Sequence, residues 1–501
     1  MIRFLTFFLL GLATLMQGAR AEVTVQPVND CWVVANMLQT VDCYHVTVPL
    51  DRANPENSSA RLAVAVLHSS SRNTAPDPVI YLEGGPGYSS FGTTYPYFDD
   101  YSEYWWEDSS SIRRTRDLIL FDQRGMGLSR PSLDCPELHD FDRRLPEVVD
   151  YDDPLWNEEI ETLGTCYDRL RAEGVPLERF DTRNSADDVA DIVRALGYDE
   201  VNLYGVSYGS RLALEVMRRH PDLVRSAVLD GVYPPTVDPE IDFPRAVADA
   251  FQNLFDDCAA SSGCRRVAPD VQNDFERLIA DLNANPRELE LYDLDYLDRG
   301  TFVRFDGSTL VMTMVEYLYD ADWLPYIPLT IGTAAKGNLD ALTYFYGLGS
   351  YASDGMIEGA FANIECREAP VLDTVAMAEE VARYGLYGEA AMTWSLVPSC
   401  NVWPVASNPL PDEGPVVSDI PTLLLSGRYD PVTPPSYADE AAETLSNSRH
   451  LVFRSGGHAV SFWFDCAMDA TADFFVDPDP ASVREPRCRS YSQPADFNVR
   501  F

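Results

Sequence analysis

Short runs of apolar residues alternate with amphipathic segments between residues 78 and 233. The apolar runs that are typical of buried strands lie at 78–83, 117–121, 201–204 and 226–229. Between residues 185 and 196 the apolar positions instead recur at helical spacing, so that they share one face. Strands and helices that alternate in this way predict an α/β fold, with a mostly parallel central sheet and helices on both faces.

This alternation stops after Pro234 and resumes only near residue 421. Helical segments and aromatic loops fill the interval up to about Val405. Beyond it the pattern predicts a strand at 421–426, a helix at 436–445, a strand at 450–454 and a helix at 459–475. We therefore expect a core in two parts, 22–234 and 406–501, separated by an inserted, mainly helical cap over 235–405.

The first residues include the basic Arg3, an apolar run from residue 4 to about 16 and the small-residue site Ala19-Arg20-Ala21. These features predict a signal peptide over 1–21 that is removed on export. An uncleaved membrane anchor is the alternative, but the apolar run is short for a bilayer span. We expect a secreted or periplasmic protein with no stable membrane insertion after cleavage.

Ten cysteines, an even number, can pair as disulfides in an oxidising compartment. Free buried thiols are the alternative, and the absence of a Cys-x-x-Cys pair disfavours a zinc site. The simplest arrangement pairs the cysteines in sequence order: Cys31 with Cys43, Cys135 with Cys166, Cys258 with Cys264, Cys366 with Cys400, and Cys466 with Cys488.

The formal net charge is −41, which disfavours a nucleic acid as a partner. An acidic surface keeps a protein soluble, and it also attracts cationic ligands such as peptide amines. The sequence carries no signal for the oligomeric state.

Ser207 lies at the centre of the motif Gly205-Val206-Ser207-Tyr208-Gly209. The motif directly follows the strand-like run at 201–204 and directly precedes a helical pattern. A sharp strand-to-helix turn needs glycines around a serine whose side chain must stand clear of the backbone. This context predicts that Ser207 is a catalytic nucleophile.

A serine nucleophile needs a general base, and the base needs an orienting carboxylate. In hydrolases with this turn the acid and then the histidine follow the serine in the chain. Asp430 comes just after the strand predicted at 421–426, and His458 comes just after the strand predicted at 450–454. We therefore predict a Ser207, Asp430 and His458 triad; loop-capping roles for the last two are the alternative.

Acyl transfer also requires hydrogen-bond donors for the developing oxyanion. The loop Gly84-Gly85-Pro86-Gly87 follows an early strand, and glycine lets a backbone amide point into a site. We predict the backbone amides of Gly85 and Tyr208 as these donors, with an ordinary Gly-Pro turn as the alternative. No metal and no cofactor is needed for this chemistry.

Several motifs together resemble the proline iminopeptidase and tripeptidyl aminopeptidase family of α/β-hydrolases. They are GGPG at 84–87, DQRGMGLS at 122–129, LYGVSYGSRLAL at 203–214, LLLSGRYDPVTPP at 423–435 and SGGH at 455–458, with weaker matches FDGSTL at 305–310 and IECRE at 364–368. The resemblance implies an α/β-hydrolase fold and hydrolysis of amide bonds near a free amino terminus.

An exopeptidase of this kind must bind the ammonium group of its substrate. Related enzymes use carboxylates near the cap, and Glu365 and Glu368, on either side of Cys366, are the candidates. Glutamates without a binding role are the alternative, because the chain is so rich in acidic residues. Glu83 stands where proline iminopeptidases usually carry histidine, and it is either a third candidate or a hydrogen-bonded loop residue.

Two further features lie near the predicted site. Asp122 and Arg124 of the DQRG motif are predicted to brace the surrounding loops through an ion pair. Aromatic residues that either line an apolar pocket or pack in the core or the cap follow the GGPG loop: Tyr95, Tyr97, Phe98, Tyr101, Tyr104, Trp105 and Trp106.

The sequence thus favours a secreted serine exopeptidase, of the aminopeptidase, proline iminopeptidase or tripeptidyl aminopeptidase type, acting on peptides with a free N-terminus. An esterase or lipase on the same fold is the first alternative, because a fold does not fix a substrate. A non-catalytic binding protein is the second, and the intact set of Ser207, Asp430 and His458 argues against it.

Overall fold

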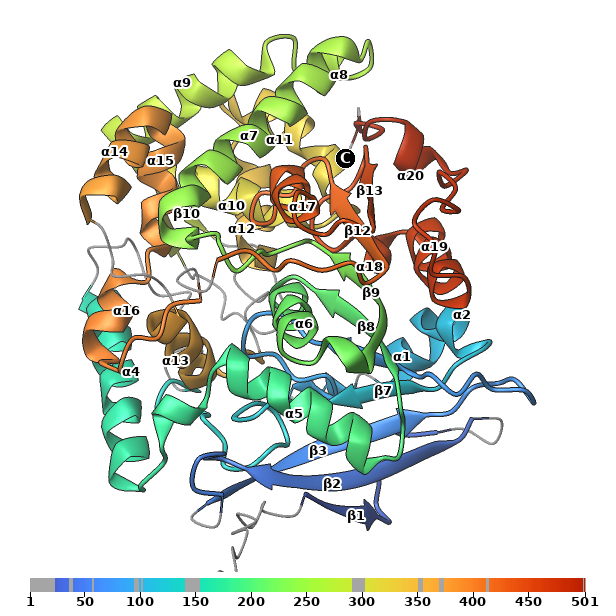
Figure 1. Ribbon diagram of the computed structural model, residues 1–501. Coiled ribbons are helices and arrows are strands. Elements are labelled where there is room, and N and C mark those ends of the chain that lie inside the picture. Colours follow the sequence, from blue (N-terminus) through green and yellow to red (C-terminus); the bar gives the residue numbers. More distant parts are fainter. Residues whose placement is uncertain are drawn as a thin grey trace, which may run out of the picture.

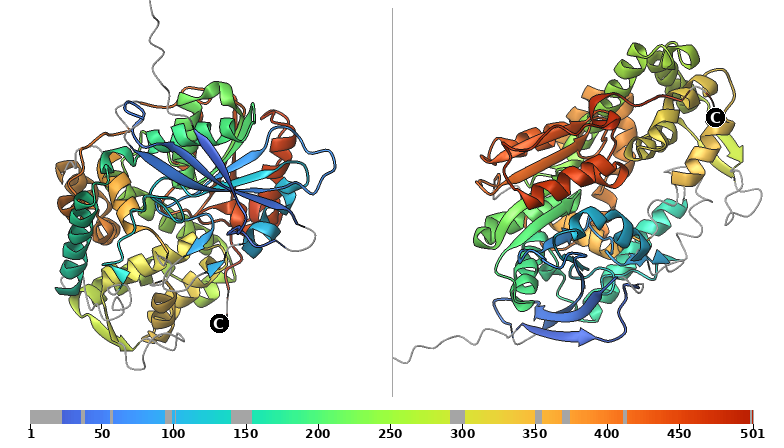
Figure 2. Two further views of the ribbon diagram at one scale, coloured as in Figure 1. Left: turned by 90° about the horizontal axis from the view of Figure 1, so that it is seen from below. Right: turned by 90° about the vertical axis from the view of Figure 1, so that its right-hand side faces the viewer.

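The computed structural model describes residues 23–35, 39–55, 58–93, 99–100, 102–139, 154–290, 302–349, 355–368, 374–410, 414–498 and 500. The predicted signal peptide over 1–21 lies outside these residues. Within the described part of the chain, nine strands form one twisted sheet (Figures 1 and 2). In spatial order they are β1 (Thr24–Val28), β2 (Val41–Pro49), β3 (Ser59–Leu67), β7 (Leu118–Phe121), β4 (Val79–Leu82), β8 (Val201–Val206), β9 (Val224–Asp230), β12 (Thr422–Gly427) and β13 (Ser448–Phe453).

The six strands from β7 to β13 in this order run parallel, whereas β1, β2 and β3 pair antiparallel at one edge. The α/β prediction with a mostly parallel sheet is confirmed. The sequence pattern did not reveal the three antiparallel strands, which precede the first predicted strand. Two short hairpins stand apart from the sheet: β5 (Gly92–Thr93) with β6 (Asp99–Asp100), and β10 (Arg287–Glu290) with β11 (Phe302–Phe305).

Helices cover both faces of the sheet. One face carries α5 (Thr182–Ala195), α6 (Tyr208–Arg219) and α17 (Pro435–Ala442), and the other carries α1 (Ser102–Asp108), α2 (Ser110–Arg113), α18 (Val460–Trp463), α19 (Asp465–Val476) and α20 (Arg489–Ser492). Side chains of β4 alternate between the faces, with Ile80 and Leu82 packed on the α5 and α6 side and Val79 and Tyr81 on the other. Such strands are apolar on both faces, which is why the sequence shows unbroken apolar runs.

The single helix predicted at 459–475 is instead two helices, α18 and α19. Ala459 has a positive φ of 58°, and Phe464 is extended between the two helices. The apolar spacing continues through this break because both helices pack on the same face of the sheet. The chain thereby turns sharply just after His458.

Between β9 and β12 the chain is mainly helical. It forms α7 (Pro239–Ala260), α8 (Cys264–Val267), α9 (Val271–Ala284), α10 (Gly307–Tyr319), α11 (Ile327–Ala334), α12 (Asp340–Gly349), α13 (Glu358–Glu368), α14 (Thr374–Tyr384), α15 (Leu386–Ala391) and α16 (Val397–Val402). Single 3₁₀ turns lie at Leu177–Arg179, Pro221–Leu223, Leu324–Tyr326 and Met392–Trp394.

These helices divide between two hydrophobic clusters. Buried side chains of α7, α9, α10 and α11 form one cluster, above the strand ends of β12 and β13 in Figure 1. By contrast, α13 and Trp403 pack with α4 (Pro154–Ala172) in the cluster on the α5 and α6 face of the sheet. The Cys366–Cys400 disulfide joins α13 to α16.

All ten cysteines lie among the described residues, and they form five disulfides that pair them in sequence order. Disulfides of this number fit an exported protein in an oxidising environment. No helix in the described ranges has the length and apolar character to cross a membrane.

Candidate active site

Ser207 occupies a sharp turn between β8 and α6. Its φ of 56° and ψ of −126° lie in a region that L-residues rarely adopt. The turn needs glycine on both sides, since a Cβ on Gly205 would lie 2.4 Å from the carbonyl oxygen of Gly209. A Cβ on Gly209 would lie 1.8 Å from the oxygen of Leu82. The serine therefore has a backbone conformation outside the helix and strand regions, and its side chain is partly exposed.

Asp430 and His458 are joined directly. Nδ1 of His458 lies 2.8 Å from Oδ2 of Asp430, in the loops that follow β13 and β12. Both side chains are buried, at 7% and 1% exposure for the histidine and the aspartate. Burial opposes the charge of Asp430, but His458 and the hydrogen bonds from Thr433 outweigh it and lower the pKa of Asp430.

Thr433 contacts both Asp430 and His458, and the sequence pattern did not predict this role. Its hydroxyl donates to Oδ2 of Asp430 at 2.7 Å and lies 2.9 Å from Nδ1 of His458. Oδ1 of Asp430 accepts from the backbone amides of Val432 (3.0 Å) and Thr433 (2.8 Å). An aspartate followed three positions later by a hydroxyl residue is a common turn signal, and this signal could have indicated the contact.

His458 is also held through its backbone. Its amide donates to the carbonyl oxygen of Tyr319 at 2.9 Å, and the indole of Trp463 donates to its carbonyl oxygen at 2.9 Å. The ring of Tyr319, at the end of α10, lies 4.7 Å from the imidazole ring. Glu316, one turn earlier on α10, has its pKa raised to about 7 by burial. Nothing in the local sequence signals these contacts, because α10 is distant along the chain.

The end of β9 connects Ser207 to the histidine. The amide of Ser207 donates to the carbonyl oxygen of Asp230 at 2.9 Å. A Cβ on the next residue, Gly231, would lie 3.0 Å from Cε1 of His458 and 3.0 Å from the hydroxyl of Thr433. The structure therefore brings the three predicted triad residues to the same edge of the sheet.

The Gly84–Gly87 loop lies against the serine. A Cβ on Gly84 would lie 3.2 Å from Cβ of Ser207. Gly85 has a φ of 103°, and a Cβ there would lie 2.8 Å from the amide nitrogen of Gly87, so this position requires glycine. Tyr208 is the first residue of α6, where an amide has no carbonyl partner within its own helix.

Glu83 forms hydrogen bonds at the start of this loop. Its Oε1 accepts from the hydroxyl of Tyr81 (3.0 Å) and from the amide of Gly84 (2.9 Å), and the amide side chain of Gln123 donates to its carbonyl oxygen (3.0 Å). Burial raises the pKa of Glu83 to about 7. These contacts match the loop role that was the alternative to amine binding.

The two glutamates of α13 differ in their surroundings. Glu368 accepts from the amide (2.5 Å) and hydroxyl (2.7 Å) of Thr182, and that hydroxyl lies 2.7 Å from the hydroxyl of Tyr208. Burial and the charge of Asp181 raise the pKa of Glu368 to about 8. Its hydrogen-bonding capacity is thus partly used within the protein.

Glu365 is buried at 6% exposure, and its carboxylate has no hydrogen-bond partner among the residues that the structure describes. Burial raises its pKa to about 7; the charge of Arg211 opposes this shift, whereas Glu240 adds to it. Burial and the charges of Glu368 and Glu365 also raise the pKa of Tyr208 well above its usual value. Glu365 thus has no hydrogen-bond partner among the described residues, and its charge acts on Tyr208, the residue that follows the serine.

The predicted ion pair between Asp122 and Arg124 is wrong. Asp122 accepts from the hydroxyl of Ser89 (2.8 Å) and from the amides of Ser90 (2.9 Å) and Leu128 (2.6 Å). Arg124 instead forms a bidentate pair with Asp188 on α5, at 2.7 and 2.6 Å. Each side chain braces a loop, but they point to different elements, because neighbours along a loop need not face each other.

Of the aromatic run, Tyr95, Tyr97, Phe98, Tyr101 and the side chain of Tyr104 lie outside the described residues. Trp105 and Trp106 are buried on the α1 and α2 face of the sheet. Their indoles donate to the carbonyl oxygens of Ser90 and Val34, each at 2.6 Å. These two tryptophans pack in the core.

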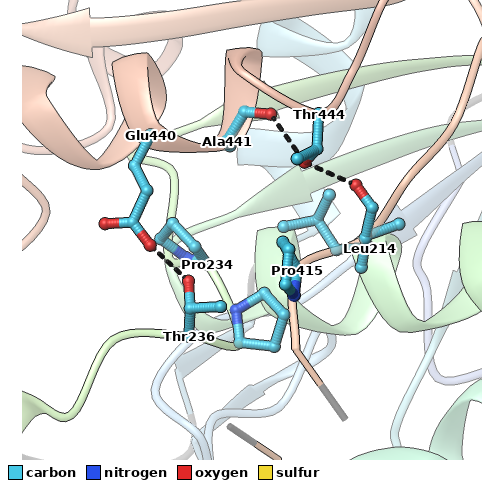
Figure 3. A pocket seen from close by; sticks show the side chains of 9 residues that line it. Leu214, Pro234, Thr236, Pro415, Glu440, Ala441 and Thr444 are labelled. Atoms are coloured by element: carbon cyan, nitrogen blue, oxygen red, sulfur yellow. Dashed lines mark hydrogen bonds between the residues drawn. The ribbon is translucent and has the colours of Figure 1, made fainter.

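A small pocket lies away from these groups, between α6, α17 and the loop after β9 (Figure 3). Pro234, Thr236, Pro415 and Glu440 are among its lining residues, and the hydroxyl of Thr236 donates to Glu440. Its lining residues include no serine, cysteine or histidine. In the described ranges, no group of three or more His, Cys, Asp or Glu side chains is arranged to hold a metal ion.

Comparison with known proteins identifies the class. The sequence family described as the alpha/beta hydrolase fold matches residues 77–465, and the chain belongs to this family. The serine protease Hip1 of Mycobacterium tuberculosis is 27% identical over 457 residues, which cover 85% of this chain and 83% of that protein. The tripeptidyl aminopeptidase of Streptomyces lividans is 30% identical over 233 residues, which cover 44% of this chain and 40% of that protein.

Other matches have different names. Carboxylesterase B of Mycobacterium tuberculosis is 27% identical over 503 residues, which cover 93% of this chain and 91% of that protein. Among solved structures, the proline iminopeptidase of Mycobacterium smegmatis has a TM-score of 0.39 and 16% identity, covering 87% of this chain and 99% of that chain. The resemblance to α/β-hydrolase serine peptidases is confirmed, and the relatives support a hydrolase of the serine peptidase type.

Proposed function

We propose that the protein is an exported serine exopeptidase that hydrolyses peptide bonds near a free N-terminus. The observation that carries this proposal is the contact between Asp430 and His458, next to the strained turn that presents Ser207. In this arrangement a weak hydroxyl nucleophile has a base, and the base has an orienting carboxylate.

The reaction proceeds through an acyl-enzyme. Ser207 attacks the scissile carbonyl while Nε2 of His458 takes its proton, and the same proton is then given to the leaving amine. Asp430 orients the imidazole and stabilises the imidazolium. Water, activated by His458, then releases the acyl product. The amides of Gly85 and Tyr208 donate to the oxyanion in both steps.

Recognition of the substrate amine falls to Glu365. Of the three candidate glutamates it is the one whose carboxylate has no hydrogen-bond partner within the described residues, while Glu83 and Glu368 bind backbone amides. A buried acid with a raised pKa gains most from a cationic partner, because an ammonium group favours the ionised form. The name of the tripeptidyl aminopeptidase relative supports the same class of substrate.

The test compares substrates that differ only at the amino group. Aminoacyl and tripeptidyl arylamides should be hydrolysed far faster when the amino group is free than when it is acetylated. Equal turnover of the free and acetylated forms would contradict the exopeptidase assignment.

An esterase is the second candidate, because the carboxylesterase B relative matches over 93% of this chain. Short acyl esters measured beside the arylamides decide between the two, since an esterase should prefer the esters and ignore the free amine. A fluorophosphonate probe distinguishes a serine hydrolase of either kind from a non-catalytic binding protein. It should label Ser207 in the native chain and leave the Ser207→Ala variant unlabelled.

A further inference from the structure

Asp230 is a buried carboxylate near the predicted triad, and it has no role in the proposed acyl-enzyme mechanism. It is the last residue of β9 and is fully buried. Its Oδ1 accepts from the amide of Val460 at 3.1 Å, and its Oδ2 accepts from the amide of Ser461 at 2.7 Å and from the hydroxyl of Ser461. These three donors lie in the turn that directly follows His458.

The same residue also contacts the nucleophile. Its carbonyl oxygen accepts from the amide of Ser207 at 2.9 Å, and its neighbour Gly231 lies against the imidazole. Asp230 therefore binds the turn at Ser207 through its carbonyl oxygen. Through its carboxylate it binds the segment 458–461, called the histidine loop. A change in its position would move Ser207 relative to His458.

The histidine loop is strained at the place where Asp230 holds it. Ala459, between His458 and Val460, has a φ of 58°. Together with Ser207 it is one of the two positive-φ residues other than glycine in the described ranges. Strained backbone persists only where surrounding contacts determine it, and the carboxylate supplies those contacts here.

Capping alone does not explain a charged group at this position. A buried charge costs several kcal/mol unless it is compensated, and a neutral side chain could also accept hydrogen bonds from the turn. The hydroxyl of Tyr204, on β8, lies 2.6 Å from that of Ser461. Asp230 therefore belongs to a buried polar cluster with Ser461 and Tyr204. What the negative charge adds is attraction for a proton on the nearby imidazole.

The titration of His458 is consistent with this. Burial disfavours its charged form, but Asp430 and then Asp230 raise its pKa above the usual value. Burial raises the pKa of Asp230 itself to about 6, against the opposing effects of Ser461 and His458. Among the described residues, the phenol of Tyr319 also packs on the imidazole; burial raises its pKa well above the usual value, so it stays neutral.

We propose that Asp230 is a positioning residue of the triad, which fixes Ser207 and His458 relative to each other and stabilises the imidazolium as a second buried carboxylate. This inference rests on the proposed serine hydrolase chemistry and not on the choice of peptide or ester substrate.

The test uses Asp230→Asn, which keeps the size of the side chain and removes its charge. We expect kcat to fall roughly ten- to a hundredfold with little change in KM, since small misplacements of reacting groups have effects of this size. The rate of fluorophosphonate labelling of Ser207 is then measured against pH. Its acid limb should move to lower pH, because loss of the Asp230 charge lowers the pKa of His458.

Asp77→Asn is the matched control. Asp77 is also a buried aspartate, which bonds Arg116 and Asn202 (each 2.9 Å) at the opposite ends of the parallel strands. This variant should lose stability and keep the acid limb of the native protein. A folded Asp230→Asn protein whose acid limb is unmoved would overturn the inference, whatever its kcat.

A second variant tests the inference if Asp230→Asn folds poorly. Ser461→Ala keeps the carboxylate and removes one of its three donors, so kcat should fall severalfold; native kcat would overturn the inference. A native chain that the fluorophosphonate does not label would overturn the proposed hydrolase function, and the inference with it. Failure of the inference alone leaves native labelling intact, so the two outcomes are distinguishable.

Discussion

Replacement of Glu365 by glutamine tests how the enzyme would recognise a free amino terminus. The change preserves the shape of the side chain in its buried position on α13 and removes the negative charge. Since no described residue hydrogen-bonds this carboxylate, the loss should fall on the bound substrate rather than on the fold.

The size of the effect follows from the interaction that is lost. A hydrogen bond to a charged group contributes ~1.5–3 kcal/mol. The kcat/KM for peptides with a free amino group should therefore fall about 10- to 150-fold, at about 1.4 kcal/mol for each factor of ten. For acetylated peptides kcat/KM should be unchanged, because they have no ammonium group.

The pH dependence gives a second, independent signature. Burial raises the pKa of Glu365 to about 7, so the free carboxyl is protonated below that pH and must lose its proton to bind an ammonium group. A peptide amino group has a pKa of about 8 and is neutral above it. The ratio of kcat/KM for free and acetylated substrates should thus be highest between these values and should fall about tenfold per pH unit on the acid side. The titration of His458 cancels in this ratio.

The assay is steady-state hydrolysis of paired free and acetylated tripeptidyl arylamides by the native chain, Glu365→Gln and Glu368→Gln. Glu368 binds Thr182, so its variant should lose stability and keep the ratio. A native ratio in Glu365→Gln would refute the assignment, and a ratio lost only in Glu368→Gln would move it to that residue.

Three further predictions follow from single contacts. Thr433→Val removes a hydrogen bond to the buried Asp430 and should lower kcat/KM roughly tenfold, whereas Thr433→Ser should retain most activity; equal rates for the two variants would contradict this role of the hydroxyl. Gly209→Ala places a Cβ 1.8 Å from the oxygen of Leu82 and should prevent fluorophosphonate labelling of Ser207, so native labelling kinetics in this variant would show that the turn is not as tight as described. Replacing Cys366 and Cys400 together by serine should lower stability to unfolding by ~2–4 kcal/mol, measured by denaturant titration, and an unchanged midpoint would count against a stabilising disulfide between α13 and α16.

Much of the candidate site was predictable from the sequence because its members occupy positions that local rules define. Ser207 lies in a turn that requires glycines, because a Cβ on Gly205 or Gly209 would lie 2.4 or 1.8 Å from a backbone oxygen, and such requirements leave a motif in the chain. Asp430 and His458 each follow a strongly apolar strand, and parallel strands bring their carboxyl ends to one edge. The order of elements therefore predicted that these residues would meet.

Local rules failed where partners come from distant elements. The pattern gave no reason to connect Asp230 with Ser461, or Tyr319 with His458, because these residues are 231 and 139 positions apart and make no periodic signal. It also paired Asp122 with Arg124, although Arg124 reaches Asp188 on α5. Charge complementarity along a loop does not reveal which way each side chain points.

The amino-acid sequence by itself determined the α/β class, the serine turn and the chain positions of the candidate acid and base, since each depends on backbone sterics or on the period of apolar residues. Only the tertiary structure decided which carboxylates remain without partners and which are bound, as the contrast between Glu365 and Glu368 shows. The physical reason is that burial and hydrogen bonding, which set the charge and availability of an acid, arise from residues that the fold brings together from distant parts of the chain.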